Sequence, residues 1–265
     1  DPATRQLLSN ISFLELKRII ENNTIVFVDE AQRIDNIGLT LKLITDHLPQ
    51  VTLYISGSSA LELNNQITES LTGRKIEHKM FPISWTELHK HYGYLQSKSQ
   101  LQTRLIYGLY PEVVTSLGNE KDILQELTNS YLFKDILALA NIKKPTILEK
   151  LLTALALQIG SEVNYTELAK LLEINKKTVE SYIQVLEQAY IVFRLQAFSQ
   201  NVRNEISRGL KIYFHDVGIR NALLGNYNAL EFRTDKGGLW ENFLISERMK
   251  YHTYNMILIN DTFDG

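Results

Sequence analysis

Residues 24–32 read TIVFVDEAQ, an apolar run that ends directly in two acids. The run Ile25–Val28 is short and rich in β-branched side chains, so it predicts a strand buried on both faces. Asp29 and Glu30 then lie at its carboxyl end, the edge of an open α/β sheet where ligands bind. Because adjacent carboxylates repel each other, a metal ion or a water to be activated is expected to offset their charge.

Composition limits the kind of protein that this chain can be. It has 265 residues, of which 44% are hydrophobic, so it can bury sizeable cores. Its formal net charge is -2, so any contact with nucleic acid has to come from a local patch. The absence of cysteine excludes disulfides and thiolate metal sites, and it fits a cytoplasmic protein. Neither a signal peptide nor a membrane-length apolar run is evident, so we expect no membrane partner.

Helical and strand patterns alternate around the opening stretch. Residues 1–23 predict helix, and a second helix at about 39–47 is closed by Pro49. A second strand is predicted at 51–55, and a third strand-like run, KIEHKMFPIS, occupies residues 75–84. Strands that alternate with helices predict a parallel sheet. After this run the pattern becomes helical as far as Gly160, a plausible helix stop.

Residues 164–190 carry a second clear motif. Asn164 with Glu167 resembles a capping box, and Asn175 can cap a second helix after a tight turn. The two helices predict a helix-turn-helix, and the strand-like runs IVFRLQAF and LKIYFHDVG that follow predict the wing of a winged helix. Because the turn lacks glycine, Glu173 is expected to adopt a strained backbone conformation.

Taken in order, these stretches resemble one protein family. IVFVDEAQ resembles a Walker B strand, and LYISGSSA resembles the strand that carries a γ-phosphate sensor. The set is completed by LTGR, FPISWTEL, GLYPEVV, the helix-turn-helix, KIYFHDVGIRNALLG and GGLWENFLISE. From about residue 20 to residue 250 the chain is similar to the prokaryotic AAA-type ATPases whose C-terminal half is a domain of unknown function (DUF4143). The order and spacing of the motifs are more specific than any single one.

The resemblance implies a fold class and four parts. We expect an α/β fold with a P-loop NTPase-like (AAA+) parallel sheet that lacks its P-loop segment. A helical linker, a winged helix and a partial restriction-endonuclease-like region are expected to follow. The expected bounds are 1–90 for the C-terminal part of the ATP-binding domain, 91–160 for the linker, 161–210 for the winged helix-turn-helix and 211–265 for the start of the DUF4143 region.

The chain departs from the family pattern in two ways. It contains no G-x-x-x-x-G-K-[ST] motif, and no acid-x-Lys pattern follows GGLWENFLISE. We therefore expect a fragment that is truncated at both ends and inactive by itself, whose intact form hydrolyses ATP. Glu241 matches the first acid of the nuclease-like region, with a solvated glutamate as the alternative. Since the second acidic motif is missing, we expect no nuclease activity.

The resemblance also implies roles for residues at the strand ends. Asp29 would hold Mg²⁺ beside bound ATP, and Glu30 would orient or deprotonate the water that attacks the γ-phosphate. Ser56, or alternatively Ser58, would sense that phosphate. The alternatives are helix-capping acids and a Ser/Gly turn with only local hydrogen bonds.

Arg74, in the stretch LTGR, would be an arginine finger. In a homo-oligomer its guanidinium would reach a neighbouring subunit and stabilise the charge on the transferred phosphoryl group. The alternative is a surface arginine paired with Glu69 or Glu77.

Lys176 and Lys177 begin the second helix of the helix-turn-helix. A helix N-terminus with two lysines suits contacts to DNA phosphates, and Arg203 adds positive charge beside the wing. Residues 161–200 nevertheless carry a net charge of -1, a poor footprint for nucleic acid. The charged residues in this range are Lys170, Lys176, Lys177, Arg194, Glu162, Glu167, Glu173, Glu180 and Glu187. Winged helices also serve as protein-contact modules.

Two hypotheses of function therefore stand side by side. In the first, the chain is part of an AAA-type ATPase that couples ATP hydrolysis to its winged-helix and DUF4143 module. In the second, it is a non-catalytic winged-helix module that binds DNA or a protein partner, and the ATPase-like half is a scaffold. The missing P-loop favours the second for the chain as given, whereas the intact Asp29 and Glu30 favour the first for the longer protein.

Overall fold

The computed structural model separates into two compact units, Asp1–Glu77 and His78–Gly265, and each is described by itself. The structure describes residues 2–9, 11–57, 71, 74–132, 136, 144–196 and 210–261. Among the helices in these ranges, none combines the length and the apolar character needed to cross a bilayer.

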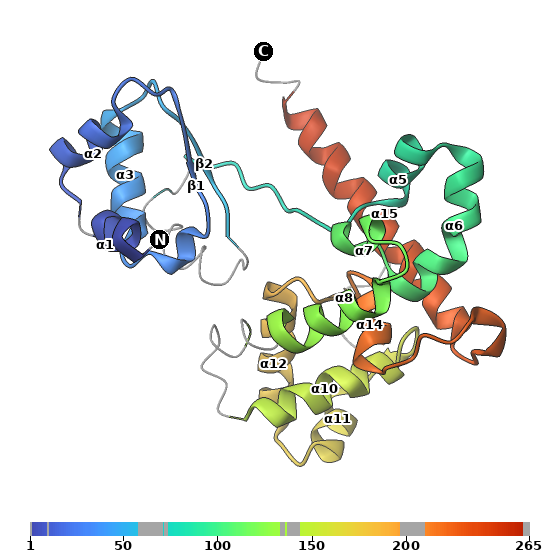
Figure 1. Ribbon diagram of the computed structural model, residues 1–265. Coiled ribbons are helices and arrows are strands. Elements are labelled where there is room, and N and C mark those ends of the chain that lie inside the picture. The colour runs from blue at the N-terminus through green and yellow to red at the C-terminus, as the bar shows by residue number, and fades with distance from the viewer. Residues whose placement is uncertain are drawn as a thin grey trace. The chain divides into compact units, whose positions relative to one another are not determined.

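The first unit is built on a small parallel sheet (Figure 1). β1 (Ile25–Val28) pairs in parallel with β2 (Thr52–Ile55), and α3 (Ile37–His47) makes the crossover between them. Both strands and this helix lie where the sequence predicted them. The helix predicted over residues 1–23 is instead two helices, α1 (Pro2–Ser9) and α2 (Phe13–Ile20), because Ser12 forms a capping box that starts α2.

The sheet is covered on one face by the described residues. Alternate side chains of each strand point to this face and pack against the buried residues of α2, α3 and the loop after β1. They are Val26 and Val28 in β1 and Leu53 and Ile55 in β2. The other side chains of the two strands are exposed, among them Ile25, Phe27 and Tyr54. The prediction that β1 is buried on both faces is therefore wrong for the described part of the chain. The reason is that none of the described elements covers the second face.

The third strand predicted at residues 75–84 is also not formed. These residues have no regular structure before α5 begins, and Ile76 and Met80 are exposed. A strand-like run becomes a strand only when a neighbouring strand pairs with its backbone hydrogen-bonding groups. No described strand does so here.

The second unit begins with a helical part. Its helices are α5 (Trp85–Tyr92), α6 (Tyr94–Tyr107), α7 (Pro111–Thr115) and α8 (Glu120–Glu126), followed by a π-helical segment, η2 (Leu127–Leu132). Ser84 forms a capping box with Glu87 at the start of α5. The region was predicted to be helical, and this is confirmed.

A mixed part with a three-stranded antiparallel sheet follows. Its elements in chain order are α10 (Pro145–Leu157), β3 (Glu162–Val163), α11 (Tyr165–Leu171), α12 (Lys176–Gln188), β4 (Val192–Gln196) and β5 (Leu210–Phe214). The strands lie in the order β3-β5-β4. Asn164 and Asn175 cap α11 and α12, as predicted. Glu173, in the turn between them, has a φ of 54°, so the predicted backbone strain is confirmed.

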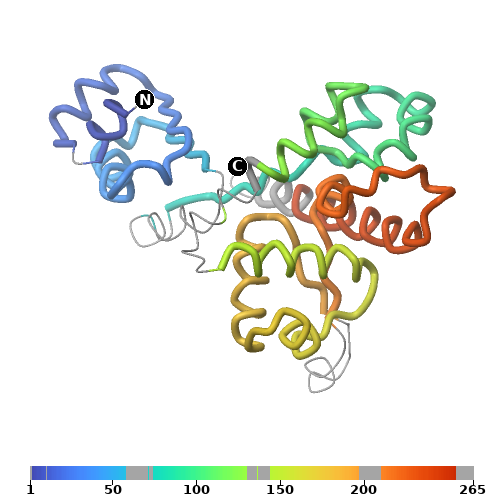
Figure 2. Tube along the Cα trace, turned by 60° about the horizontal axis from the view of Figure 1, so that its bottom comes forward, coloured from blue at the N-terminus to red at the C-terminus, as the bar shows by residue number. Residues whose placement is uncertain are grey.

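After β5, the described part of the second unit contains α14 (Val217–Leu223), η3 (Leu230–Phe232) and the long helix α15 (Lys236–Asp261). α14 packs on both α6 and α10, and the Cα trace shows it next to each of them (Figure 2). In α15, Leu239 and Phe243 are buried, whereas Leu244 is exposed.

Candidate functional site

The carboxyl ends of β1 and β2 bring together three of the predicted site residues. Asp29 and Glu30 follow β1, and Ser56 follows β2, with Val28 paired to Ile55 immediately before them. The Ser56 hydroxyl donates a hydrogen bond to Oδ1 of Asp29. The strands being parallel, these side chains meet at the edge where α/β sheets bind ligands.

Backbone hydrogen bonds hold this edge in shape. The N–H of Ser56 donates to the carbonyl of Val28 at 3.0 Å, and the N–H of Ala31 donates to the carbonyl of Ser56 at 3.1 Å. Ala31 is fully buried beneath the loop. The loop that carries the two acids is therefore tied to the end of the neighbouring strand.

Asp29 is exposed and has spare bonding capacity. Its Oδ1 accepts hydrogen bonds from Ser56 and, at 3.1 Å, from the N–H of Glu30. Within the described residues, Oδ2 accepts no hydrogen bond. Mg²⁺ in nucleotide sites takes one or two carboxylates together with waters and phosphate oxygens. One oriented carboxylate with a free oxygen fits that use.

Glu30 has an unusual backbone for a glutamate. Its φ of 52° and ψ of 42° lie in the left-handed region, which costs roughly 1–2 kcal/mol for a residue with a side chain. It begins a short 3-10 helix, η1 (Ala31–Arg33), and its Oε2 lies 2.9 Å from Nε of Arg33 and 3.1 Å from Nε2 of Gln32. Strained residues of this kind cluster at functional sites. Glu21, Asn36, Glu173 and Tyr190 also have a positive φ, so the strain alone assigns no role to Glu30.

Arg74 pairs with an acid of α3 and not with Asp29 or Glu30. Its guanidinium pairs with Asp46 near the end of α3, and not with the predicted alternative Glu77, which pairs with Lys75 at 3.9 Å. Glu69 and Ser58 lie outside the described residues. An arginine finger acts in the site of a neighbouring subunit. The pairing with Asp46 lies within one chain, so it does not test that role, which stays a prediction.

Lys176 and Lys177 form the exposed first turn of α12. Asn175 Oδ1 accepts hydrogen bonds from the backbone N–H and the hydroxyl of Thr178, at 2.7 and 2.9 Å. The two ammonium groups are accessible, with the exposed Glu180 on the same helix. Arg203 lies outside the described residues.

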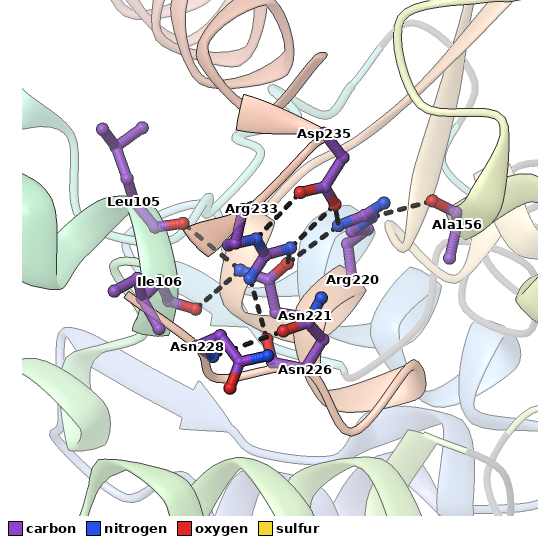
Figure 3. Close-up of polar contacts among 9 residues, drawn as sticks. All are labelled: Leu105, Ile106, Ala156, Arg220, Asn221, Asn226, Asn228, Arg233 and Asp235. Carbon is purple, nitrogen blue, oxygen red and sulfur yellow. Dashed lines mark hydrogen bonds and ion pairs between the residues drawn. The ribbon is translucent and has the colours of Figure 1, made fainter. Parts of the chain in front are cut away.

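The second unit also holds a buried polar network that the sequence patterns did not indicate (Figure 3). Arg220, Asn221 and Arg233 are only 1%, 0% and 5% exposed. Both guanidinium groups pair with Asp235, and Oδ1 of Asn221 accepts hydrogen bonds from both, at 3.0 and 2.9 Å. The hydrogen bond from Arg233, and then that from Arg220, holds the pKa of Asp235 well below its usual range.

Helix ends supply the remaining partners of this network. Arg220 Nε donates to the carbonyl of Ala156 in the last turn of α10 at 2.8 Å. Asn221 Nδ2 donates to the carbonyls of Leu105 and Ile106 in the last turn of α6, at 3.2 and 2.8 Å. The negative end of the α10 dipole thus helps to offset the charge of Arg220, whereas the end of α6 is satisfied by the neutral amide of Asn221. The only sequence signal was an Arg-Asn pair within the otherwise apolar stretch VGIRNALL.

Glu241 is neither freely solvated nor part of an acidic cluster. It accepts hydrogen bonds from Tyr213 at 2.6 Å and from Lys211 at 2.7 Å, and these bonds, with Lys211 contributing most, lower its pKa. Across the ranges that the structure describes, no group of three or more His, Asp or Glu side chains is placed to hold a metal ion. The described residues thus contain no ready-made multi-carboxylate metal centre.

Comparison with protein families divides the chain in a similar place. Residues 1–89 match the family described as an AAA domain, and residues 98–229 match a domain of unknown function (DUF8612). The strand-edge residues Asp29, Glu30 and Ser56 fall within the first match, and the segment predicted to be a helix-turn-helix falls within the second.

Several curated relatives from prokaryotes align with most of the chain. An uncharacterised protein of Methanocaldococcus jannaschii is 26% identical over 269 residues, covering 91% of this chain and 57% of that protein. An uncharacterised protein of Haemophilus influenzae is 27% identical, covering 77% of this chain and 52% of its own length. One from Mycobacterium tuberculosis is 26% identical, covering 84% and 50%. The chain spans about half the length of these relatives.

Proposed function

We propose that this chain is part of an AAA-type ATPase in which Asp29, Glu30 and Ser56 act on Mg²⁺-bound ATP. The observation that carries the proposal is the hydrogen bond from Ser56 to Asp29 at the paired ends of two parallel strands. The same residues lie in the segment that is similar to the AAA domain. An exposed strand edge with a spare carboxylate oxygen is what a nucleotide-bound magnesium ion requires.

Asp29 would hold Mg²⁺ through Oδ2, directly or through a water. Its Oδ1 is already oriented by the Ser56 hydroxyl and the N–H of Glu30. When bound, the ion supplies positive charge to the phosphate oxygens as negative charge shifts during phosphoryl transfer. Ser56 would keep Asp29 oriented and sense the γ-phosphate, with Ser58 as the alternative sensor.

Glu30 would accept a hydrogen bond from the water that attacks the γ-phosphate. For this its carboxylate has to exchange Arg33 and Gln32, its present partners, for that water. Both partners lie in η1, within three residues of Glu30, so the exchange needs no change in the strands. A positioned carboxylate of this kind contributes roughly 10²–10⁴-fold to rate.

The proposal concerns the longer protein. The 265 residues contain no G-x-x-x-x-G-K-[ST] motif, so a phosphate-binding loop has to come from outside them. Arg74 would act as an arginine finger between subunits of a homo-oligomer, after release of its ion pair with Asp46.

The test uses protein expressed from the complete reading frame around these residues, so that any preceding phosphate-binding loop is included. We expect Mg²⁺-dependent phosphate release that Glu30→Gln lowers at least 100-fold while ATP binding is retained. Glu21→Gln is the matched control, because Glu21 is an exposed glutamate of the same unit with a similar φ of 50°. Equal turnover in the two variants contradicts the role of Glu30.

A second candidate function is supported by the mixed part of the second unit. Its helix and strand order, with the sheet order β3-β5-β4, is the arrangement expected of a winged helix. In this candidate the chain is a non-catalytic binding module for DNA or a protein partner, and Lys176 and Lys177 contact DNA phosphates. We do not extend either candidate to nuclease chemistry, because Glu241 is engaged by Lys211 and Tyr213.

DNA binding is tested by fluorescence anisotropy as salt is varied. If the lysines contact phosphates, the double change Lys176→Gln/Lys177→Gln weakens binding and reduces the salt slope by about 2, whereas Lys170→Gln on the preceding helix leaves it unchanged. If wild type binds no ATP and no DNA, the remaining candidate is a protein partner.

A further inference from the structure

The chain becomes anchored to the second unit at Phe81. Residues 75–80 are exposed, whereas Phe81 and the four residues after it are half-buried or buried. The Phe81 ring stacks on His215 with ring centroids 5.5 Å apart, and it meets Tyr254 edge-on at 6.0 Å. The N–H of Ile83 donates to the carbonyl of Leu109 at 2.9 Å. Residues 75–85 are called the connector below, because they join the first unit to the helices of the second.

Two charged side chains of α15 hold the backbone of the connector. Glu247 Oε2 accepts a hydrogen bond from the N–H of Trp85 at 2.6 Å, and Lys250 Nζ donates to the carbonyl of Ile83 at 3.2 Å. Lys250 and Glu247 also pair with each other at 2.7 Å, and the Lys250 side chain is 1% exposed. A buried pair of this kind contributes little net stability but requires one defined geometry. We call Glu247 and Lys250 the connector latch.

The same helix is fixed to β5 one to two turns earlier. Asn242 exchanges two hydrogen bonds with the backbone of Phe214, at 2.7 Å to its N–H and 2.8 Å to its carbonyl. His215, which stacks on Phe81, follows Phe214 directly. α15 therefore touches the connector through one set of side chains and β5, the central strand of the antiparallel sheet, through another.

We propose that the connector latch is a coupling joint, which passes movement of the connector through α15 to β5 and the sheet beside the helix-turn-helix. Buried hydrogen bonds at both contacts make α15 a rigid link, because a displaced connector has to move the helix or leave charges unpaired. The part of the inference in which nucleotide binding drives the movement rests on the proposed ATPase function. The anchoring of the connector does not.

The test variant is Glu247→Met/Lys250→Met, which removes both charges together and leaves neither buried alone. Its matched control is Lys211→Met/Glu241→Met, because this Lys–Glu pair has the same 2.7 Å separation and also involves α15, but reaches β5 instead of the connector. Hydrogen exchange of the connector is measured without nucleotide. We expect the amides of Ile83 and Trp85 to exchange at least tenfold faster in the test variant, and to be unchanged in the control. Unchanged exchange in the test variant overturns the latch.

Coupling is then read from β5 in the complete protein. A non-hydrolysable ATP analogue is expected to change amide exchange at residues 210–214 in wild type. In the latch variant the analogue should still bind and ATP should still be hydrolysed, but the response of β5 should be lost. A β5 response that persists in the latch variant overturns the coupling. Failure of wild type to bind the analogue refutes the proposed ATPase and the nucleotide-driven coupling together, while the exchange result without nucleotide still decides the latch.

Discussion

The strand edge of the first unit and the buried network of the second use similar side chains in opposite ways. At the strand edge, Asp29 is exposed, is bonded through one carboxylate oxygen, and precedes a strained Glu30. In the network, Asp235 accepts from two buried guanidinium groups, whose other hydrogen bonds go to Asn221 and to backbone carbonyls. An acid with unused oxygens at a strand edge can accept a ligand. An acid whose two oxygens are both engaged by buried arginines serves the fold.

Removing the shared carboxylate of the network should have the largest effect on stability. Asp235→Asn leaves Arg220 and Arg233 buried without their counter-ion, so we expect the second unit to lose about 3–5 kcal/mol of unfolding free energy. Tryptophan fluorescence during urea unfolding measures this, because both tryptophans, Trp85 and Trp240, lie in the second unit. An unchanged midpoint would show that the network is not required for the fold.

The controls for this change sharpen the contrast. Glu241→Gln removes a more exposed ion pair on α15 and should cost no more than about 1 kcal/mol. Asp29→Asn, at the exposed strand edge, should leave the circular dichroism of the folded chain unchanged while lowering Mg²⁺-dependent ATP turnover in the complete protein.

The next largest effect depends on pH and on His215. This ring is buried among Phe81, Tyr190 and Phe193, and burial, followed by Lys250 and Lys79, lowers its pKa to about 4. In the folded state His215 therefore binds a proton only when the pH falls to about 4, whereas in the unfolded state it binds one below about pH 6.5. The stability due to neutral His215 is complete above pH 6.5 and is lost as pH falls to about 4, in total about 3 kcal/mol.

His215→Phe should remove this dependence. Urea midpoints measured between pH 7.5 and pH 4.5 should fall less steeply in the variant than in wild type, and His252→Gln, an exposed histidine, should behave as wild type. The neighbouring Asp216 has a pKa raised by burial and acts in the opposite direction, but it is present in all three proteins. Parallel pH profiles for wild type and His215→Phe would contradict the assignment.

A smaller effect is expected where α14 approaches α6. A Cβ at Gly218 would lie 2.1 Å from the carbonyl oxygen of Tyr107, which belongs to the backbone and cannot move aside easily. Gly218→Ala should therefore lower the unfolding free energy by about 1–3 kcal/mol in the same fluorescence assay. Gly237→Ala is the control, because a Cβ there meets nothing within 4 Å, and it should be neutral or slightly stabilising. Equal stability of the two variants would contradict close helix contact at Gly218.

Local features were predictable from the sequence to a greater extent than contacts between distant segments. The parallel strand pair, the caps at Asn164 and Asn175 and the strain at Glu173 follow from neighbouring residues, and the structure confirms them. The meeting of Asp29 with Ser56 followed from the parallel arrangement of two predicted strands.

What could not be predicted depends on residues far apart in the chain. Arg220 bonds to Ala156, and Asn221 bonds to Leu105, more than 100 residues away. In the sequence, polar residues on a helix are usually read as solvent-exposed, since nothing local identifies the helix ends that will receive them. The run KIEHKMFPIS is similarly predicted to be a strand, because its local residue pattern carries no information on whether a partner strand is present.

The smallest expected effect separates two kinds of strain. Glu173 and Glu30 both have a left-handed backbone, with φ of 54° and 52°. Glycine adopts this conformation freely, but it also gives the unfolded chain more freedom, so Glu173→Gly should stabilise the second unit by about 0.5–1 kcal/mol without loss of ATP turnover. Glu30→Gly relieves the same strain in the first unit, yet it should abolish turnover. If Glu30→Gly keeps turnover, the strain at the strand edge is a property of the turn alone, as it is at Glu173. If turnover is lost while the fold is kept, the strain persists at Glu30 because its carboxylate is needed there.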